Sequence, residues 1–256
     1  MDTVFEMVDE FGPEKVIHIA NRDAGLRAIV VVDNTASGPS VGGVRMASDV
    51  TLEECARLAR AMSLKNAAAG LPHGGGKSVI MADPAMSAAE KEGLMRAYAQ
   101  AISQLTDYVP GPDMGTDETC MAWVRDEIGR AVGLPSVVGG IPLDEIGATG
   151  FGIAAAANVA EEFSGIALDG ARVAIQGYGA VGRHAARFLA QEGARIVAVA
   201  DSRGTAFLPK DLVLSRLDAI KVRSKQQAKA LRILAASKHP LSASVLAQQA
   251  GCTTGP

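Results

Sequence analysis

Residues 173–201 read VAIQGYGAVGRHAARFLAQEGARIVAVAD and contain Gly177, Gly179 and Gly182 in the spacing G-x-G-x-x-G. An apolar run precedes the first glycine, a helix-forming stretch follows the third, and a second apolar run ends at Asp201. In a strand–helix–strand unit of this kind, the first glycine permits a tight turn, the second lets backbone approach a pyrophosphate, and the third allows close packing of helix on strand. The stretch therefore predicts a Rossmann-type dinucleotide site. The alternative is a glycine-rich turn that binds no ligand.

The start of the expected helix would hold the phosphates, since its N–H groups and dipole favour an anion. Asp201 would accept hydrogen bonds from the adenosine ribose, and an acid at this position favours NAD because it repels the 2′-phosphate of NADP. Arg203 lies two residues further on and leaves NADP open. The candidate cofactor-binding residues of this motif are Gly177, Gly179, Ala180, Val181, Gly182, Asp201 and Ser202.

Strand and helix signals alternate through the rest of the chain, which predicts an α/β fold. The expected strands lie at residues 27–33, 78–82, 172–176 and 195–201. The expected helices start at the capping boxes 51–54 and 87–90, the second running to about residue 106, at Thr116, at about residue 150 and at the glycine motif. A Gly-Gly-Ile-Pro linker at 139–142 divides the chain. We expect an N-terminal α/β substrate-binding and oligomerisation domain at 1–140, and an incomplete Rossmann-type domain at 141–214.

The composition argues against several other classes of protein. The 256 residues are 48% hydrophobic and carry a formal net charge of −3, which is too small to favour a nucleic acid or an acidic lipid as partner. The three cysteines are scattered, so neither a disulfide framework nor a zinc site is expected, and a reducing, cytoplasmic compartment fits them. The N-terminus lacks the apolar segment of a signal peptide, and no apolar run approaches the ~20 residues that cross a bilayer. We expect neither a metal site nor a membrane span.

Three charged residues stand out in the middle of the chain. Lys65 lies near the end of an expected helix, Lys77 follows what reads as a triple-glycine turn, and Asp113 lies in a Gly-Pro-Asp turn. Each has an ordinary interpretation, because a lysine near a helix C-terminus is usually solvated and an aspartate after Gly-Pro is usually a turn former. The glycines before Lys77 indicate otherwise there. They let backbone and substrate crowd a lysine that can polarise a carbonyl or activate water.

Five ordered motifs carry a family resemblance. They are SVGGVRM (40–46), MSLKNAAAGLPHGGGKSVI (62–80), GPDMGT (111–116), GATGFG (147–152) and QGYGAVG (176–182). The region from Val41 to Asp201 resembles the glutamate/leucine/phenylalanine/valine dehydrogenases, and is most similar to the leucine type. The resemblance implies oxidation of an amino acid to a 2-oxo acid and ammonium with NAD, in a cleft between domains of a homo-oligomer.

The resemblance also implies roles for individual residues. Lys65 would bind the substrate α-carboxylate, Lys77 would activate the water that attacks the imino carbon, and Asp113 would shuttle protons. Thr149 would hydrogen-bond the amide of the nicotinamide. The further candidate substrate-binding residues are Val41, Gly42, Gly43 and Gly75.

Position 41 bears on the substrate side chain. Glutamate enzymes of the family typically place a lysine just before the two glycines of this motif, and here that residue is Val41. An apolar residue cannot neutralise a buried carboxylate, and leaving one unpaired costs several kcal/mol. This favours leucine, valine or another apolar substrate. Two alternatives stay open: Val41 is only a packing residue, or the chain is a glutamate dehydrogenase, which parts of the segment 139–152 resemble more.

The resemblance ends near Leu214, so the chain reads as C-terminally truncated with an unrelated helical tail at 215–256 that includes a partial helix-turn-helix pattern. We expect a sheet of two strands in the second domain, with an unpaired edge at Val197, and hence a poor enzyme or none. A truncated non-catalytic assembly or interaction protein is the alternative from another class. DNA binding through the tail is disfavoured by the net charge of −3.

Overall fold

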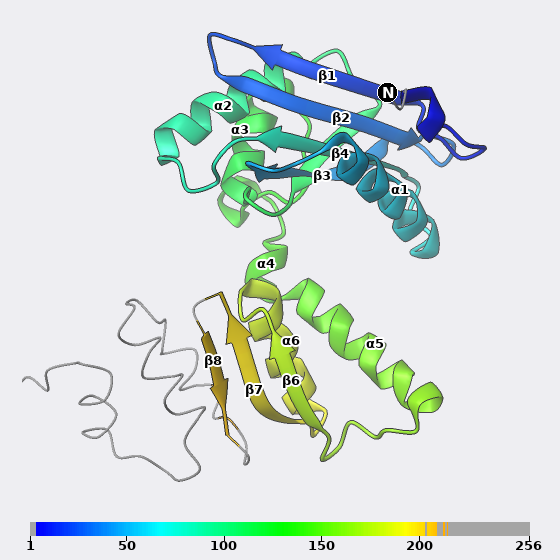
Figure 1. The fold of residues 1–256 in the computed structure, drawn as a ribbon, viewed down its shortest axis with the longest axis vertical. Helices are drawn as coiled ribbons and strands as arrows, with labels where there is room; N and C mark the ends of the chain where they lie inside the picture. The colour runs from blue at the N-terminus through cyan, green and yellow to red at the C-terminus, as the bar shows by residue number, and fades with distance from the viewer. Residues whose placement is uncertain (1–3, 203, 209–211, 213, 215–256) are drawn as a thin grey trace, which may run out of the picture. The chain divides into compact units, whose positions relative to one another are not determined.

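The computed structural model describes residues 4–202, 204–208, 212 and 214 (Figure 1). Its contacts divide the chain into two compact units, Met1–Pro142 and Leu143–Pro256. Both units are mixed α/β, as the alternating pattern predicts. The tail predicted at 215–256 lies outside the described residues.

The first unit is built on a five-stranded sheet in the order β1-β2-β4-β3-β5. The strands are β1 (Lys15–Asn21), β2 (Leu26–Asn34), β3 (Ser40–Ala47), β4 (Gly74–Met81) and β5 (Tyr108–Pro112). β1 and β2 are antiparallel, as are β2 and β4, whereas β3 is parallel to both β4 and β5. The carboxyl ends of β3, β4 and β5 therefore lie at one edge of the sheet, where side chains from three strands can converge.

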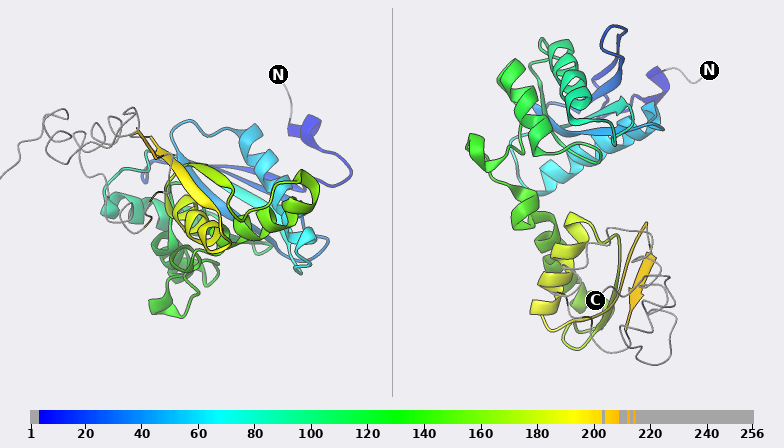
Figure 2. Two further views of the ribbon diagram at one scale, coloured as in Figure 1. Left: turned by 90° about the horizontal axis from the view of Figure 1, so that it is seen from below. Right: turned by 90° about the vertical axis from the view of Figure 1, so that its left-hand side faces the viewer.

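Helices cover both faces of this sheet (Figure 2). α1 (Leu52–Ala68) packs on one face against a cluster that includes Val31 and Val79. α2 (Ala88–Ala101) and α3 (Glu118–Ile128) pack on the other face, where the larger core contains Val30 and Ile80. Neighbouring strand residues thus enter opposite cores, as the alternation of side chains along a strand requires. Short helices complete the path of the chain: η1 (Val4–Met7), η2 (Ser136–Val138) and α4 (Leu143–Ile146).

Polar contacts hold α1 to the sheet along its length. The buried carboxylate of Asp33 accepts hydrogen bonds from Arg60 Nε at 3.0 Å and from Ser63 Oγ at 2.6 Å. Near the end of the helix, the buried Asn66 amide donates to Gly74 O at 2.7 Å. α1 is therefore fixed to both β2 and β4.

The second unit contains α5 (Ala148–Ser164), β6 (Arg172–Gln176), α6 (Ala180–Gln191), β7 (Arg195–Asp201) and β8 (Gly204–Phe207). β6 and β7 are parallel and joined through α6, and β8 pairs antiparallel with the other side of β7. The prediction of an unpaired edge at Val197 is wrong, because β7 is the central strand of three. β8 was not predicted from the sequence, because it is four residues long and follows directly on a turn.

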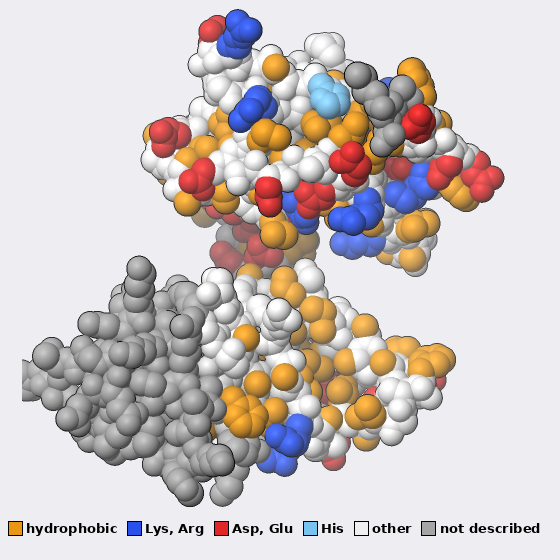
Figure 3. Space-filling view, in the orientation of Figure 1, with side chains coloured by type: hydrophobic (Ala, Val, Ile, Leu, Met, Phe, Trp, Pro, Cys, Tyr) orange, Lys and Arg blue, Asp and Glu red, His pale blue; other side chains and the backbone are white. Residues whose placement is uncertain are grey.

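The helices α5 and α6 of the second unit pack against each other. A Cβ on Gly150 would lie 2.6 Å from Ala185 N, so this glycine allows the close approach, and the rings of Phe151 and Phe188 meet edge to face with centroids 5.5 Å apart. Hydrophobic side chains gather over α5 in the space-filling view (Figure 3). Val159 and Phe163 of this helix are exposed.

The predicted bounds of β6 and β7 match the structure, and other predictions need correction. α2 ends at Ala101, well before residue 106. Thr116 is not a helix cap, since Asp117 caps α3 and accepts from Cys120 N at 2.9 Å. The glycines before Lys77 form no turn, because they are the first residues of β4.

Candidate active site

Lys77 and Asp113 form an ion pair at the carboxyl end of β5, beside the middle of β3 and β4. Lys77 lies within β4 and Asp113 directly follows β5, and Lys77 Nζ is 3.0 Å from Asp113 Oδ2. The lysine side chain is 6% exposed and the aspartate side chain 23% exposed. The two candidate catalytic residues are thus brought together, with the carboxylate on the more open side of the pair.

Glycines make room for this pair. A Cβ on Gly43 of β3 would lie 2.8 Å from Asp113 Cβ and 3.1 Å from Lys77 Nζ, so any side chain there would displace one of them. A Cβ on Gly42 would lie 1.6 Å from Gly76 O, and one on Gly75 would lie 2.0 Å from Ser63 N in α1. These positions were expected to touch substrate. In the structure, Gly42 and Gly75 allow close packing of the elements around the site, and Gly43 borders the ion pair.

A second cation contacts the same carboxylate. Arg45 of β3 places Nε 2.8 Å from Asp113 Oδ2, and its Nη1 lies 2.5 Å from Glu54 Oε1 at the start of α1. From the sequence, Arg45 had no predicted role, and Glu54 was predicted to close a capping box. Thr51 Oγ1 does accept from Glu54 N, but the Glu54 carboxylate binds the arginine instead of closing the box. The sequence feature that could have identified Arg45 is a single charged residue between the apolar residues Val44 and Met46, both of which are buried in β3.

The electrostatics of Asp113 follow from this arrangement. Burial acts to raise the pKa of Asp113, but the charge and hydrogen bond of Lys77 and those of Arg45 outweigh it and lower the pKa below its ordinary value. Asp113 is therefore a carboxylate at neutral pH. The nearby Cys55 is no competing nucleophile, because burial raises the pKa of its thiol to about 12.

The loop after β5 is fastened to β3, which fixes Asp113. Thr116 Oγ1 accepts from Asp113 N at 3.0 Å and donates to Val44 O at 2.7 Å. Met46 N donates to Met114 O at 2.8 Å. Thr116 is thus a structural residue of the site.

A buried hydroxyl chain supports the site from the opposite face of the sheet. Tyr108 Oη donates to Gly42 O at 2.9 Å and accepts from Ser78 Oγ at 3.0 Å, and Ser78 Oγ lies 2.6 Å from Tyr98 Oη. The chain joins β3, β4, β5 and α2 directly behind Lys77, so it ties together the strands that carry the ion pair.

Lys65 and Val41 are placed differently from the pair. Lys65 lies in the last turn of α1 and is exposed, and no described hydrogen bond or ion pair joins it to Lys77 or Asp113. Val41 lies two residues before Gly43 on β3 and is half-buried. Since alternate residues of a strand share a face, Val41 lies on the face that carries the pair.

The dinucleotide motif has the geometry that a phosphate site requires. Gly177 has φ +91° and donates its N–H to Ala200 O at 2.8 Å, and a Cβ on Gly182 would lie 1.9 Å from Gly177 O. Gly179 is the N-cap of α6, offers the helix no side-chain hydrogen bond, and has no atom within 4 Å of where its Cβ would be. The first and third glycines thus serve the turn and the packing. The second faces open space at a helix N-terminus that begins with Ala180 and Val181, which fits a pyrophosphate.

The other candidate cofactor residues lie at the ends of elements. Asp201 is the last residue of β7, opposite Gly204 of β8, and Ser202 is in the turn that follows. Thr149 is the second residue of α5 and is exposed.

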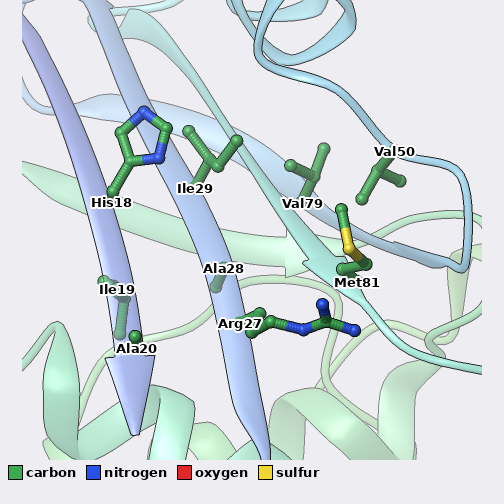
Figure 4. Close-up of a pocket in the computed structure, with 9 residues that line it drawn as sticks. All are labelled: His18, Ile19, Ala20, Arg27, Ala28, Ile29, Val50, Val79 and Met81. Carbon is green, nitrogen blue, oxygen red and sulfur yellow. The ribbon is translucent and has the colours of Figure 1, made fainter.

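One hollow in the first unit is separate from all of these residues. It has a volume of about 320 Å³ and lies beside β1, β2 and β4 (Figure 4). Its floor is mostly apolar, with Ile29, Val79 and Met81, and Arg27 and His18 line it as well. Among the described residues, no group of three or more His, Cys, Asp or Glu could hold a metal ion, and no helix is long and apolar enough to cross a membrane.

Comparison with known families gives matches to both units. Residues 13–130 match the model of the Glu/Leu/Phe/Val dehydrogenase dimerisation domain, and residues 139–250 match that of Glutamate/Leucine/Phenylalanine/Valine dehydrogenase. The chain belongs to this family. The second match extends past Leu214, where the resemblance was expected to end, and into residues that lie outside the described part of the chain.

Within the Glu/Leu/Phe/Val dehydrogenase family, the chain is similar to enzymes of two names. It is 42% identical to a glutamate dehydrogenase of Aeropyrum pernix, over 70% of this chain and 46% of that protein. It is 35% identical to a leucine dehydrogenase of Geobacillus stearothermophilus, over 76% of this chain and 54% of that protein. The chain therefore spans about half the length of the curated relatives it matches.

A solved structure shares the fold. The hetero-hexameric glutamate dehydrogenase of Thermus thermophilus, in a leucine-bound form, superposes with a TM-score of 0.73 at 31% identity, covering 86% of this chain and 59% of that one. The fold expected from the sequence, an α/β first domain followed by a partial Rossmann-type sheet, is confirmed.

Proposed function

We propose that this chain provides the substrate-binding pair and the dinucleotide-binding motif of an NAD(P)-dependent amino-acid dehydrogenase. The reaction converts an amino acid, NAD⁺ and water into a 2-oxo acid, ammonium, NADH and a proton. The single observation that carries the proposal is the buried Lys77 bound to the carboxylate of Asp113, at the carboxyl end of β5.

Each member of the pair would have one task. Asp113, a carboxylate with one open side, accepts a proton from the substrate ammonium, so that a free amine remains. Lys77 is enclosed and positively charged, so it stabilises negative charge that develops on a water or carbonyl oxygen at the reacting carbon. Lys65, exposed at the end of α1, is proposed to bind the α-carboxylate.

The cofactor, when bound, accepts the hydride. The chain would hold it through α6, whose first-turn N–H groups would bind the phosphates, and through Asp201, which would accept hydrogen bonds from the adenosine ribose. Ser202 and Thr149 are the proposed further contacts. An acid at position 201 supports NAD over NADP.

For the substrate side chain we propose an apolar amino acid of the leucine or valine type. Val41 supports this, since it lies on the same face of β3 as the glycine beside Lys77 and brings no cation. Glutamate is the second candidate, supported by the 42% identity to a protein named glutamate dehydrogenase.

The assembly and location are part of the same proposal. The first unit matches a model described as a dimerisation domain, which supports a homo-oligomer. A cytoplasmic location is supported by the two free, buried thiols of Cys55 and Cys120.

Calorimetric titration of the 256-residue chain with NADH and with a 2-oxo acid tests the function. Lys77→Ala should lose 2-oxo acid binding and keep NADH binding, and Lys15→Ala, which removes a lysine from the edge strand β1, should keep both. Gly179→Asp should lose NADH binding and keep 2-oxo acid binding. The new carboxylate would cap α6 and repel phosphate at a position where the fold has open space. The proposed function is wrong if the unmodified chain binds neither ligand. It is also wrong if Lys77→Ala and Gly179→Asp both bind NADH and the 2-oxo acid normally.

Titration with 2-oxo-4-methylpentanoate and 2-oxoglutarate separates the two substrate classes. The unmodified chain should bind the apolar acid more tightly, and Val41→Lys should reverse the order because it supplies the missing cation. Tighter binding of 2-oxoglutarate by the unmodified chain would identify the glutamate class.

A further inference from the structure

The two oxygens of the Asp113 carboxylate have different surroundings. Lys77 Nζ at 3.0 Å and Arg45 Nε at 2.8 Å both contact Oδ2. In the described part of the chain, no hydrogen bond or ion pair reaches Oδ1. One oxygen is therefore shared by two cations, and the other is left for a ligand.

Arg45 is itself held at both ends. Its Nε donates to Asp113 and its Nη1 to Glu54, which belongs to the first turn of α1. The side chains of Arg45 and Glu54 are 17% and 26% exposed, so neither is a freely moving surface group. The planar guanidinium thus spans two carboxylates on different elements, and Glu54 fixes the plane in which it meets Asp113.

We propose that Arg45 is a positioning residue: held by Glu54, it fixes the Asp113 carboxylate so that Oδ2 stays on Lys77 and Oδ1 faces the amino group of the substrate. This inference deepens the proposed function and rests on it. In the step itself, an N–H bond of the substrate ammonium breaks, an O–H bond forms at Oδ1, and the electron pair stays on nitrogen. With two cations already on Oδ2, protonation of that oxygen is disfavoured, so the proton goes to Oδ1.

The charged groups around Asp113 come from two strands and one helix. Lys77 lies on β4 and Arg45 on β3, while Glu54 faces Arg45 from α1, so two positive and two negative groups alternate. Removing Arg45 leaves Glu54 without its partner and Asp113 with only one cation. Replacing it with lysine keeps a charge near Asp113 but removes the planar bridge to Glu54.

Three variants of the full chain test the proposal. Carboxyl ¹³C NMR, with the Asp113 signal assigned through Asp113→Asn, measures its pKa. Arg45→Met should raise that pKa by about 1 or more, since an opposite charge within this distance lowers a carboxyl pKa by that amount. Arg45→Lys should raise it less than Arg45→Met does, because a positive charge stays near Asp113. Arg96→Met is the matched control: Arg96 binds Glu92 and two acids of α3 on the opposite face of the sheet, so its loss should not change Asp113.

Crystal structures of the variants test the orientation. In Arg45→Lys, the Asp113 carboxylate should rotate off Lys77 or adopt two orientations, and amino-acid-dependent NADH formation should fall about 100-fold, as for a catalytic group misplaced by about 1 Å. An unchanged pKa in Arg45→Met, or an unmoved carboxylate in Arg45→Lys, overturns the inference. Failure of the unmodified chain to bind NADH and a 2-oxo acid counts against the proposed function, and these two measurements stay decisive for Arg45 whether or not that chain forms NADH.

Discussion

Gly43→Ala tests how tightly the site is packed. The added Cβ would lie 2.8 Å from Asp113 Cβ, 3.0 Å from Pro112 O and 3.1 Å from Lys77 Nζ. Carbon atoms in contact normally lie about 3.5–4.0 Å apart, so Asp113 must move by about 1 Å or β3 must separate from the end of β5. Overpacking of this kind costs about 1–3 kcal/mol of stability.

Urea unfolding measures the loss of stability, and titration with a 2-oxo acid measures the loss of binding. Moving a catalytic group by about 1 Å can lower a rate ~100-fold, so any turnover should fall far more than the stability loss alone explains. Gly93→Ala is the control, since its Cβ would meet nothing within 4 Å and it lies inside α2. That variant should gain about 0.5–1 kcal/mol, because alanine favours a helix over glycine. If Gly43→Ala is as stable as the unmodified chain and keeps the Lys77–Asp113 distance, the argument from packing is refuted.

Three further outcomes are expected. Ser87→Ala removes a complete capping box from α2 and should lower the free energy of unfolding by about 1 kcal/mol in urea titrations. The pKa of Asp113 is lower in the folded protein than its ordinary value of 3.8. Its pairing with Lys77 therefore stabilises the fold fully at a pH above 3.8. This stabilisation is lost as the pH falls through the pKa of the folded state. The urea midpoint should accordingly fall more steeply below the ordinary carboxyl pKa of 3.8 for the unmodified chain than for Asp113→Asn. Amide hydrogen exchange should be slower in β7, which is bonded on both sides, than in β6, and equal rates would contradict the pairing described.

The second unit was the easier part to predict from the sequence. The predicted bounds of β6 and β7 match the structure because local signals agree there: an apolar run, a glycine motif and a helix-forming stretch follow in order. β8 was missed, since four residues after a turn carry too little pattern to indicate a strand.

The first unit shows where local signals mislead. The three glycines before Lys77 were predicted to form a turn, yet they lie in β4. Glycine is needed at positions 75 and 76 because Ser63 of α1 and the ring of Tyr108 come too close for any side chain there. Tertiary packing, and not turn chemistry, selects glycine at these positions.

The site was predicted in part. Lys77 and Asp113 were both assigned to the candidate site, and the structure brings them together. Arg45 and Glu54 were not assigned to the site, because their contacts depend on how β3 meets β5 and α1, and no periodicity in the sequence carries that information.

The glycine pairs on β3 and β4 have a consequence for protein engineering. A library that randomises Gly42, Gly43, Gly75 and Gly76 to change substrate preference would consist mostly of destabilised members. A Cβ at each position would lie less than 3 Å from backbone, from a buried ring or, at Gly43, from the Asp113 side chain. Diversity is better introduced at Val41, the half-buried neighbour that can change size or charge without touching the backbone contacts. Variants with a new substrate preference should therefore carry substitutions at Val41, and not at the four glycines.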